Sequence, residues 1–109
     1  MRLLHGSYTE ILTPNLTKCK GKNDFGKGFY LTPNWKRAWQ MGKRSTFLHG
    51  GKITVNAFLF YPNIVRQCGE AYLDESNLSI LVSRISQFGL SYIQYCFCTQ
   101  KAINELIKD

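Results

Sequence analysis

Acidic side chains are scarce in this 109-residue chain, which has 7 Asp and Glu residues against 14 Lys and Arg residues. The shortage lies in the first half, because residues 1–52 carry ten bases and two acids whereas residues 53–109 carry four bases and five acids. The net charge of +7 indicates an anionic partner for the first half, such as nucleic acid, a phosphorylated cofactor or an acidic protein. The alternative is a basic surface that only keeps the protein soluble.

Long apolar runs are also missing, since no stretch approaches the roughly 20 apolar residues that a membrane-spanning helix needs. The N-terminus does not resemble a signal peptide, because His5 and Gly6 interrupt it directly after two leucines. We therefore expect a cytoplasmic protein that makes no use of a membrane. The length predicts a single domain over residues 1–109, because a typical domain takes roughly 100–200 residues.

The four cysteines show no CxxC spacing and the chain has only two histidines, His5 and His49. This pattern favours buried free thiols over disulfides or a zinc site, so we expect no metal. Cys19 lies in an irregular stretch with no base at a motif-like position, which argues against a Cys–His hydrolase. The cysteines are Cys19, Cys68, Cys96 and Cys98.

Apolar periodicity and turn residues predict an α+β domain without repeats. Strands are expected over Met1–Leu4, after a glycine-rich turn that begins at Asp24, over Lys52–Phe60 and over Ser91–Cys98, with a turn at Gly50-Gly51. Helices are expected from Thr32 as N-cap and Pro33 to Gly42–Arg44, over Asp74–Phe88, and from Thr99 to Ile107. Residues 8–22 read as an irregular, basic connector.

Two short segments carry the candidate chemistry. His5-Gly6-Ser7 reads as a turn in which Gly6 can offer its N–H and C=O to a planar amide while His5 holds a sugar hydroxyl. Tyr30 follows the glycine-rich turn and can present a flat ring to a ligand. Each segment also has a purely structural interpretation, as a turn with an incidental histidine and as a packed tyrosine.

Taken in order, these segments resemble the ADP-ribosyltransferase superfamily, in the branch marked by a His, a Tyr and a later Glu on three strands. HGS resembles the first motif, and KGFYLTPNWKRAWQM resembles the second, with Ala38 eight residues beyond Tyr30. The chain is most similar to small bacterial proteins, mostly catalogued as a domain of unknown function, that end in a motif like QYCFCTQKAI, here Gln94–Ile103.

The resemblance implies a split β-sheet with short flanking helices and NAD in the cleft between two small sheets. His5 would hold the adenosine ribose, the Gly6 backbone would grip the carboxamide and Tyr30 would stack on the nicotinamide. Ser7 would support the ribose, Gly28 and Thr32 would complete the cofactor-binding motif, and the lysines of Lys18–Lys22 with Lys27 would lie near the pyrophosphate.

The implied function is mono-ADP-ribosyl transfer from NAD to a macromolecule, as a toxin or effector with a cognate antitoxin or neutralising partner. Tyr30 and Gln94 are the implied catalytic residues. Gln94 stands where the branch generally has glutamate, and it can orient a ribose but supplies no negative charge. Met41 replaces a second aromatic residue, and the segment 61–89 is shorter than in close relatives.

Two other functions stay open. One is a module that binds NAD or ADP-ribose without turnover, for which Gln94 and Met41 are the supporting features. The other is a basic nucleic-acid- or protein-binding domain, whose binding would weaken steeply with salt.

Overall fold

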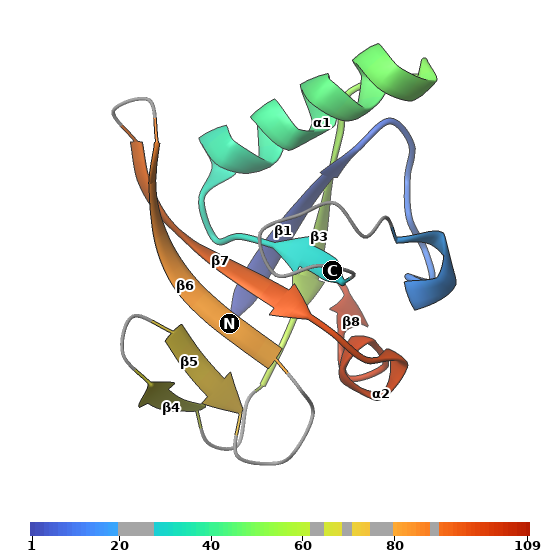
Figure 1. The fold of residues 1–109 in the computed structure, drawn as a ribbon. Coiled ribbons are helices and arrows are strands. Elements are labelled where there is room, and N and C mark those ends of the chain that lie inside the picture. Colours follow the sequence, from blue (N-terminus) through green and yellow to red (C-terminus); the bar gives the residue numbers. More distant parts are fainter. Residues whose placement is uncertain (20–27, 62–64, 69–70, 75–79, 88–89) are drawn as a thin grey trace.

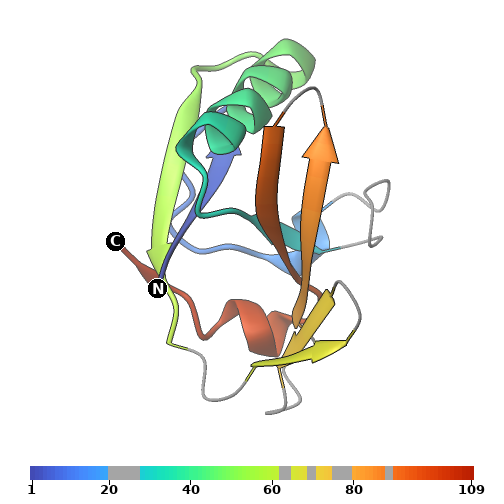
Figure 2. The ribbon, with the colours of Figure 1, turned by 90° about the vertical axis from the view of Figure 1, so that its left-hand side faces the viewer.

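Two antiparallel sheets and one long helix make up the chain, whose computed structural model describes residues 1–19, 28–61, 65–68, 71–74, 80–87 and 90–109. A three-stranded sheet has the order β1-β3-β8, and a five-stranded sheet has the order β2-β7-β6-β5-β4 (Figures 1 and 2). The elements are β1 (Arg2–Ser7), η1 (Leu16–Lys18), β2 (Phe29–Leu31), α1 (Trp35–His49), β3 (Thr54–Leu59), β4 (Val65–Cys68), β5 (Ala71–Asp74), β6 (Ile80–Gln87), β7 (Leu90–Phe97), α2 (Gln100–Ile103) and β8 (Ile107–Lys108).

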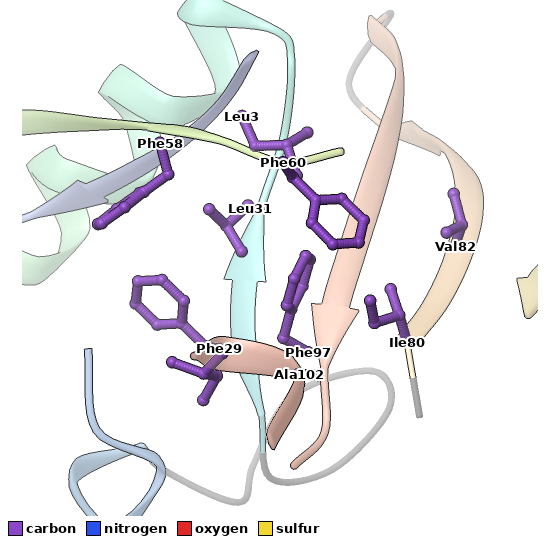
Figure 3. Packing of buried hydrophobic residues seen from close by; sticks show 10 residues of the cluster. Leu3, Phe29, Leu31, Phe58, Phe60, Ile80, Val82, Phe97 and Ala102 are labelled. Carbon is purple, nitrogen blue, oxygen red and sulfur yellow. The ribbon is translucent and has the colours of Figure 1, made fainter. Parts of the chain in front are cut away.

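The hydrophobic core lies between the two sheets. Figure 3 shows Phe58 and Phe60 from one side meeting Phe29 and Phe97 from the other. The rings of Phe60 and Phe97 pack edge to face with centroids 5.1 Å apart, a favoured aromatic geometry. The predicted α+β fold with a split sheet and flanking helices is therefore confirmed.

Among the described residues, the backbones of the two sheets are hydrogen-bonded to each other at a single isolated bridge. Leu4 of β1 and Thr32, next to β2, exchange both backbone hydrogen bonds, at 2.8 and 2.9 Å. Beyond this bridge the two strands belong to different sheets (Figure 1). The sheets consequently split next to the residues that follow Leu4, which are His5, Gly6 and Ser7.

Helix α1 packs directly on the backbone of β1. A Cβ atom placed on Gly6 would lie 1.8 Å from the carbonyl oxygen of Ala38 and 2.4 Å from the backbone nitrogen of Gly42. Ala38 is fully buried at this contact. The small residues Gly6, Ala38 and Gly42 thus allow a close crossing of strand and helix.

The predicted bounds of α1 are wrong at both ends. The helix begins at Trp35, because Asn34 rather than Thr32 is the N-cap and accepts a hydrogen bond from Arg37 N at 2.9 Å. It continues through Gly42 to His49, since Gly42 serves the contact with β1 and does not end the helix.

The helix predicted over Asp74–Phe88 is also wrong, because this segment contains the end of β5 and all of β6. Strand β6 pairs with β7 from Ile80↔Phe97 to Gln87↔Leu90. The apolar positions match a helical period, but the pairing with β7 and the burial of Ile80 and Val82 in the core favour a strand. Residues 75–79 and 88–89 of the predicted helix lie outside the described residues.

The first strand is longer than predicted, since HGS is part of β1 and is not a turn. The turn at Gly50-Gly51 is confirmed by positive φ angles of 78° and 82°. The strands predicted over Lys52–Phe60 and Ser91–Cys98 are confirmed as β3 and β7.

The final helix has the predicted cap, since Thr99 Oγ1 accepts a hydrogen bond from Ala102 N at 3.1 Å. It ends at Ile103 rather than Ile107, which belongs to β8. In the described part of the chain, no helix combines the length and apolar character that crossing a membrane requires.

Candidate functional site

The open edge of β1 is the centre of the candidate site. Successive residues of a strand direct their backbone N–H and C=O groups to alternate sides. Because Leu4 directs both groups to Thr32, Gly6 directs its own two groups to the same side, away from β3. No described strand pairs with this edge beyond the Leu4–Thr32 bridge. The Gly6 amide and carbonyl therefore face the split between the sheets.

The side chain of His5, on β1, extends across the split between the two sheets and contacts β2. Its Nδ1 is 2.6 Å from the carbonyl oxygen of Tyr30, and its ring packs on Phe29 with centroids 4.3 Å apart. A carbonyl oxygen only accepts, so Nδ1 must carry the proton and donate it. Burial lowers the pKa of His5 to about 4, the hydrogen bond to Tyr30 opposes this shift, and the charge of Lys108 adds to it. At neutral pH the ring is uncharged, and Nε2, which has no hydrogen-bond partner among the described residues, can accept a hydrogen bond.

Tyr30 occupies the middle of β2 and is 6% exposed. It pairs with Cys96 of β7, and the two side chains are joined by a hydrogen bond. Burial raises the pKa of the Cys96 thiol to about 12, the hydrogen bond with Cys98 adds to the rise, and the bond with Tyr30 opposes it. Gly28 lies beside the same thiol, because a Cβ atom on it would be 2.4 Å from Cys96 Sγ. Packing on Cys96 therefore explains the glycine at position 28.

Gln94 shares the face of the five-stranded sheet that carries Tyr30. It lies two residues before Cys96 on β7, so Tyr30 and Gln94 are diagonal neighbours on adjacent strands. The Cα atoms of such neighbours are typically about 7–8 Å apart, which is within reach of long side chains. Gln94 is 4% exposed, and its side-chain amide makes no hydrogen bond to the described residues. Arg37 Nε is the one fully buried side-chain polar atom without a partner in the described part of the chain. The Gln94 side chain is thus almost completely buried on the face that carries Tyr30.

The Thr32 side chain has a structural role at the split, and Ser7 is buried there. The Thr32 hydroxyl donates to the Ile93 carbonyl at 2.8 Å and accepts from Asn34 N at 3.1 Å. It joins β2 to β7 and the start of α1, so its hydroxyl is occupied. Ser7 is buried and ends β1 opposite Thr54.

The buried amide of Asn56, on β3 opposite His5, is a site residue that the sequence analysis missed. Its Oδ1 accepts from Ile11 N at 2.8 Å and from Lys108 Nζ at 3.1 Å. Its Nδ2 donates to the carbonyls of His5 and Thr9, each at 3.3 Å. Asn56 thus fixes the segment 9–11 and the backbone of His5. Asn56 is the one amide side chain in the strand-forming segment 52–60, and this is the signal that could have indicated it.

Arg37, in the first turn of α1, is a second residue that was not predicted. Its guanidinium carbon lies 5.1 Å from the centre of the Tyr92 ring, and Tyr92 precedes Gln94 by two residues on the same face of β7. The arginine therefore adds positive charge beside the face that carries Gln94 and Tyr30.

Of the predicted phosphate-binding lysines, Lys18 is described and exposed, whereas Lys20, Lys22 and Lys27 lie outside the described residues. Met41 is half-buried on α1, about 160° around the helix from Trp39, so these two side chains do not share a face. None of the three described cysteines with assigned side chains, Cys19, Cys96 and Cys98, forms a disulfide. Within the described ranges, no three His, Cys, Asp or Glu side chains gather as a metal site would require.

Comparison with known proteins gives a family without an assigned activity. The family described as "Protein of unknown function (DUF3990)" matches residues 1–81, which include β1, β2 and α1. No curated protein and no solved structure matches the chain. Gln94 lies beyond the matched residues. Because the match covers well over half of the sequence, the chain belongs to the DUF3990 family.

Proposed function

We propose that this protein is a mono-ADP-ribosyltransferase that takes ADP-ribose from NAD and attaches it to a macromolecule in the cytoplasm. The observation that carries the proposal is the open edge of Gly6 beside the uncharged ring of His5, with Tyr30 directly across the split. NAD is the ADP-ribose donor, and the acceptor is a protein or a nucleic acid. A toxin or effector role with a cognate neutralising partner fits such a reaction.

The Gly6 edge suits the nicotinamide carboxamide. A primary amide has two donors and one acceptor, and Gly6 presents one N–H and one C=O on the same side of β1. Such paired hydrogen bonds fix the plane of the amide. Tyr30 can then lie against the pyridinium face, where aromatic stacking and attraction between the cation and the ring both favour binding.

His5 suits a ribose hydroxyl. Its Nδ1 proton is held by the Tyr30 carbonyl, so the free Nε2 lone pair accepts a hydrogen bond. The depressed pKa keeps this acceptor unprotonated over the whole neutral range. Gln94 can orient the second ribose through its amide oxygen, because that amide makes no hydrogen bond to the described residues.

The reaction breaks the bond between the ribose C1′ carbon and the nicotinamide nitrogen. The electron pair leaves with nicotinamide, and a nucleophile of the acceptor forms the new bond to C1′ and loses its proton. Positive charge develops on the ribose in the transition state, so groups that hold the ribose and present oxygen dipoles accelerate the step. Gln94 supplies such a dipole, and the site then depends more on orientation than on a full negative charge.

Nicotinamide release and label transfer test the proposal. The wild-type protein, with NAD labelled in the adenylate and a cell lysate, should release nicotinamide and label a macromolecule. Tyr30→Phe keeps the ring and should retain both activities, whereas Tyr30→Leu fills the same buried position without a ring and should lose at least about tenfold. Tyr61→Ala, at an exposed position away from the split, is the matched control.

Circular dichroism must show that Tyr30→Leu is folded, and Gln94→Leu gives a second variant at the site. Equal nicotinamide release by wild type, Tyr30→Leu and Gln94→Leu would contradict the proposed roles of these residues. Gln94→Glu restores a carboxylate at a nearly unchanged volume, and we expect it to raise the rate of nicotinamide release.

A binding module for NAD or ADP-ribose is the second candidate, and the neutral Gln94 amide favours it. Calorimetry separates the two functions. Saturable binding of NAD without nicotinamide release by wild type or by Gln94→Glu would indicate a binding module.

A further inference from the structure

Helix α1 presents a basic and aromatic outer surface that nothing described in the chain covers. Its sequence, WKRAWQMGKRSTFLH, holds four Lys and Arg residues and no Asp or Glu. Its two buried residues, Ala38 and Gly42, are small and lie against β1. In Figures 1 and 2 no described helix or strand lies over the opposite side.

Four large apolar side chains of α1 are exposed, and three of them, Trp39, Phe47 and Leu48, lie on this outer surface. Phe47 is 89% exposed and Trp35 is 61% exposed, and Trp39 and Leu48 are exposed as well. Exposed single apolar residues are common, but four of them on one 15-residue helix form a concentration that marks interaction surfaces.

Three of the four basic side chains of α1, Lys36, Lys43 and Arg44, are exposed, whereas Arg37 is half-buried with its guanidinium over the Tyr92 ring. Among the described residues, the one ion pair joins Arg2 to Asp109, outside the helix. Lys43 Nζ instead lies 5.6 Å from the centre of the Trp39 ring. Lys36 and Arg44 are exposed on the same outer surface. The positive charge of α1 is therefore available to a partner.

Apolar and basic side chains alternate around the helix instead of forming two separate faces. At 100° per residue, the outer surface runs through Trp39, Lys43, Phe47, Arg44 and Leu48 in that angular order. A helix that lies in a membrane surface needs a continuous apolar face opposite a charged face, which this order does not provide. Single-stranded nucleic acid binds to aromatic rings that stack on nucleobases. The aliphatic Leu48 offers no such ring, whereas apolar side chains of an acidic peptide can contact Trp39, Phe47 and Leu48 alike.

We propose that the outer surface of α1 is a docking site for an acidic segment of a partner protein that carries aromatic or aliphatic side chains. Trp and Arg residues contribute strongly to binding at protein interfaces, and basic side chains around apolar anchors complement acidic ones. The docking site is independent of the split between the sheets and of the function proposed for it.

Binding of a random copolymer of glutamate and tyrosine tests the proposal. Fluorescence of Trp35 and Trp39 reports its binding, in comparison with polyglutamate, polyuridylate and vesicles of phosphatidylcholine with phosphatidylglycerol. At about 150 mM salt, where exposed charges are screened beyond about 8 Å, we expect the copolymer to bind more tightly than the other three. Tighter binding of polyuridylate or of the vesicles would overturn the proposal.

Matched variants locate the binding site. Lys43→Glu combined with Arg44→Glu should weaken copolymer binding at least about tenfold, and Phe47→Ala should weaken it by a similar factor. Arg84→Glu combined with Lys101→Glu changes the net charge equally at exposed positions outside α1 and should leave binding within about twofold. Equal losses in the two charge-reversal pairs would show that net charge alone attracts the copolymer, and would overturn the docking site.

Discussion

Replacing Gly6 by alanine should destabilise the fold strongly, because the added Cβ atom meets backbone atoms. The atom would lie 1.8 Å from Ala38 O, 2.4 Å from Gly42 N and 2.9 Å from Ala38 C. Backbone atoms cannot rotate away, so α1 must move outward by more than about 1 Å to restore van der Waals contact. Overpacking of this kind costs about 3 kcal/mol or more in the free energy of unfolding.

Urea unfolding followed by circular dichroism measures this cost. With a slope of about 1.5 kcal/mol per molar urea, a loss of about 3 kcal/mol lowers the midpoint by about 2 M. Gly42→Ala is the matched control, because its Cβ would lie 3.0 Å from the γ2 methyl of Ile53 and 3.4 Å from the backbone of Ser7, and alanine is favoured within a helix. We expect Gly42→Ala within about 1 kcal/mol of wild type. A Gly6→Ala protein equally close to wild type would refute the direct contact of α1 with β1.

Three further predictions concern buried polar groups near the split. The pKa of His5 lies below that of an unfolded histidine, so the stability that the neutral ring contributes is complete above about pH 6.5 and is lost as pH falls toward about 4. From pH 7 to 4.5 we expect the free energy of unfolding, measured in urea, to fall by about 2 kcal/mol more for wild type than for His5→Gln. Equal losses in the two proteins would contradict the buried, neutral ring. Asn56→Ala removes the partners of Ile11 N and of the His5 carbonyl and should cost about 2–3 kcal/mol in the same assay. Asn56→Asp sets a carboxylate oxygen against the carbonyls of His5 and Thr9 and should also destabilise the protein; unchanged stability of either variant would argue against this hydrogen-bond network. The raised pKa of Cys96 leaves about a thousandfold less thiolate at pH 8 than an ordinary thiol has. Peptide mapping after brief alkylation should therefore find Cys96 unmodified in the native protein and modified in the denatured protein. Rapid labelling of Cys96 in the native protein would contradict its burial.

The parts of the fold with strong local signals could be predicted from the sequence. The strict alternation of side chains over residues 91–98 predicted β7, in which Tyr92, Gln94 and Cys96 are buried on one face. The positive φ angles of Gly50 and Gly51 belong to the predicted turn. These features depend on near neighbours along the chain, which a pattern of residues records.

The errors arose where distant contacts decide the structure. Gly42 is a residue type typical of helix C-termini, but its contact with β1 keeps it inside α1. The segment 80–87 has helical spacing, but the pairing of β6 with β7 makes it a strand. Gly6 has the appearance of a turn residue, whereas its lack of a side chain is required by Ala38 of α1. No local pattern contains these partners.

The candidate site was predicted in part. His5 and Tyr30 are brought together by a hydrogen bond of 2.6 Å, and Gln94 lies diagonally from Tyr30 on the neighbouring strand. The sequence could not reveal that the hydroxyl of Thr32 is occupied by the backbone or that Asn56 holds the backbone of His5, because both facts depend on strand register.

Titration of the ¹⁵N-labelled protein with NAD, followed by NMR, tests the central claim most directly. We predict that NAD at about 1 mM shifts the backbone amides of Gly6 and Tyr30 and the side-chain amide of Gln94, while ADP, which lacks the nicotinamide, leaves the Gly6 amide in place. Unchanged positions of these three signals at the same NAD concentration, or equal shifts with ADP, would contradict a nicotinamide site at the split between the sheets.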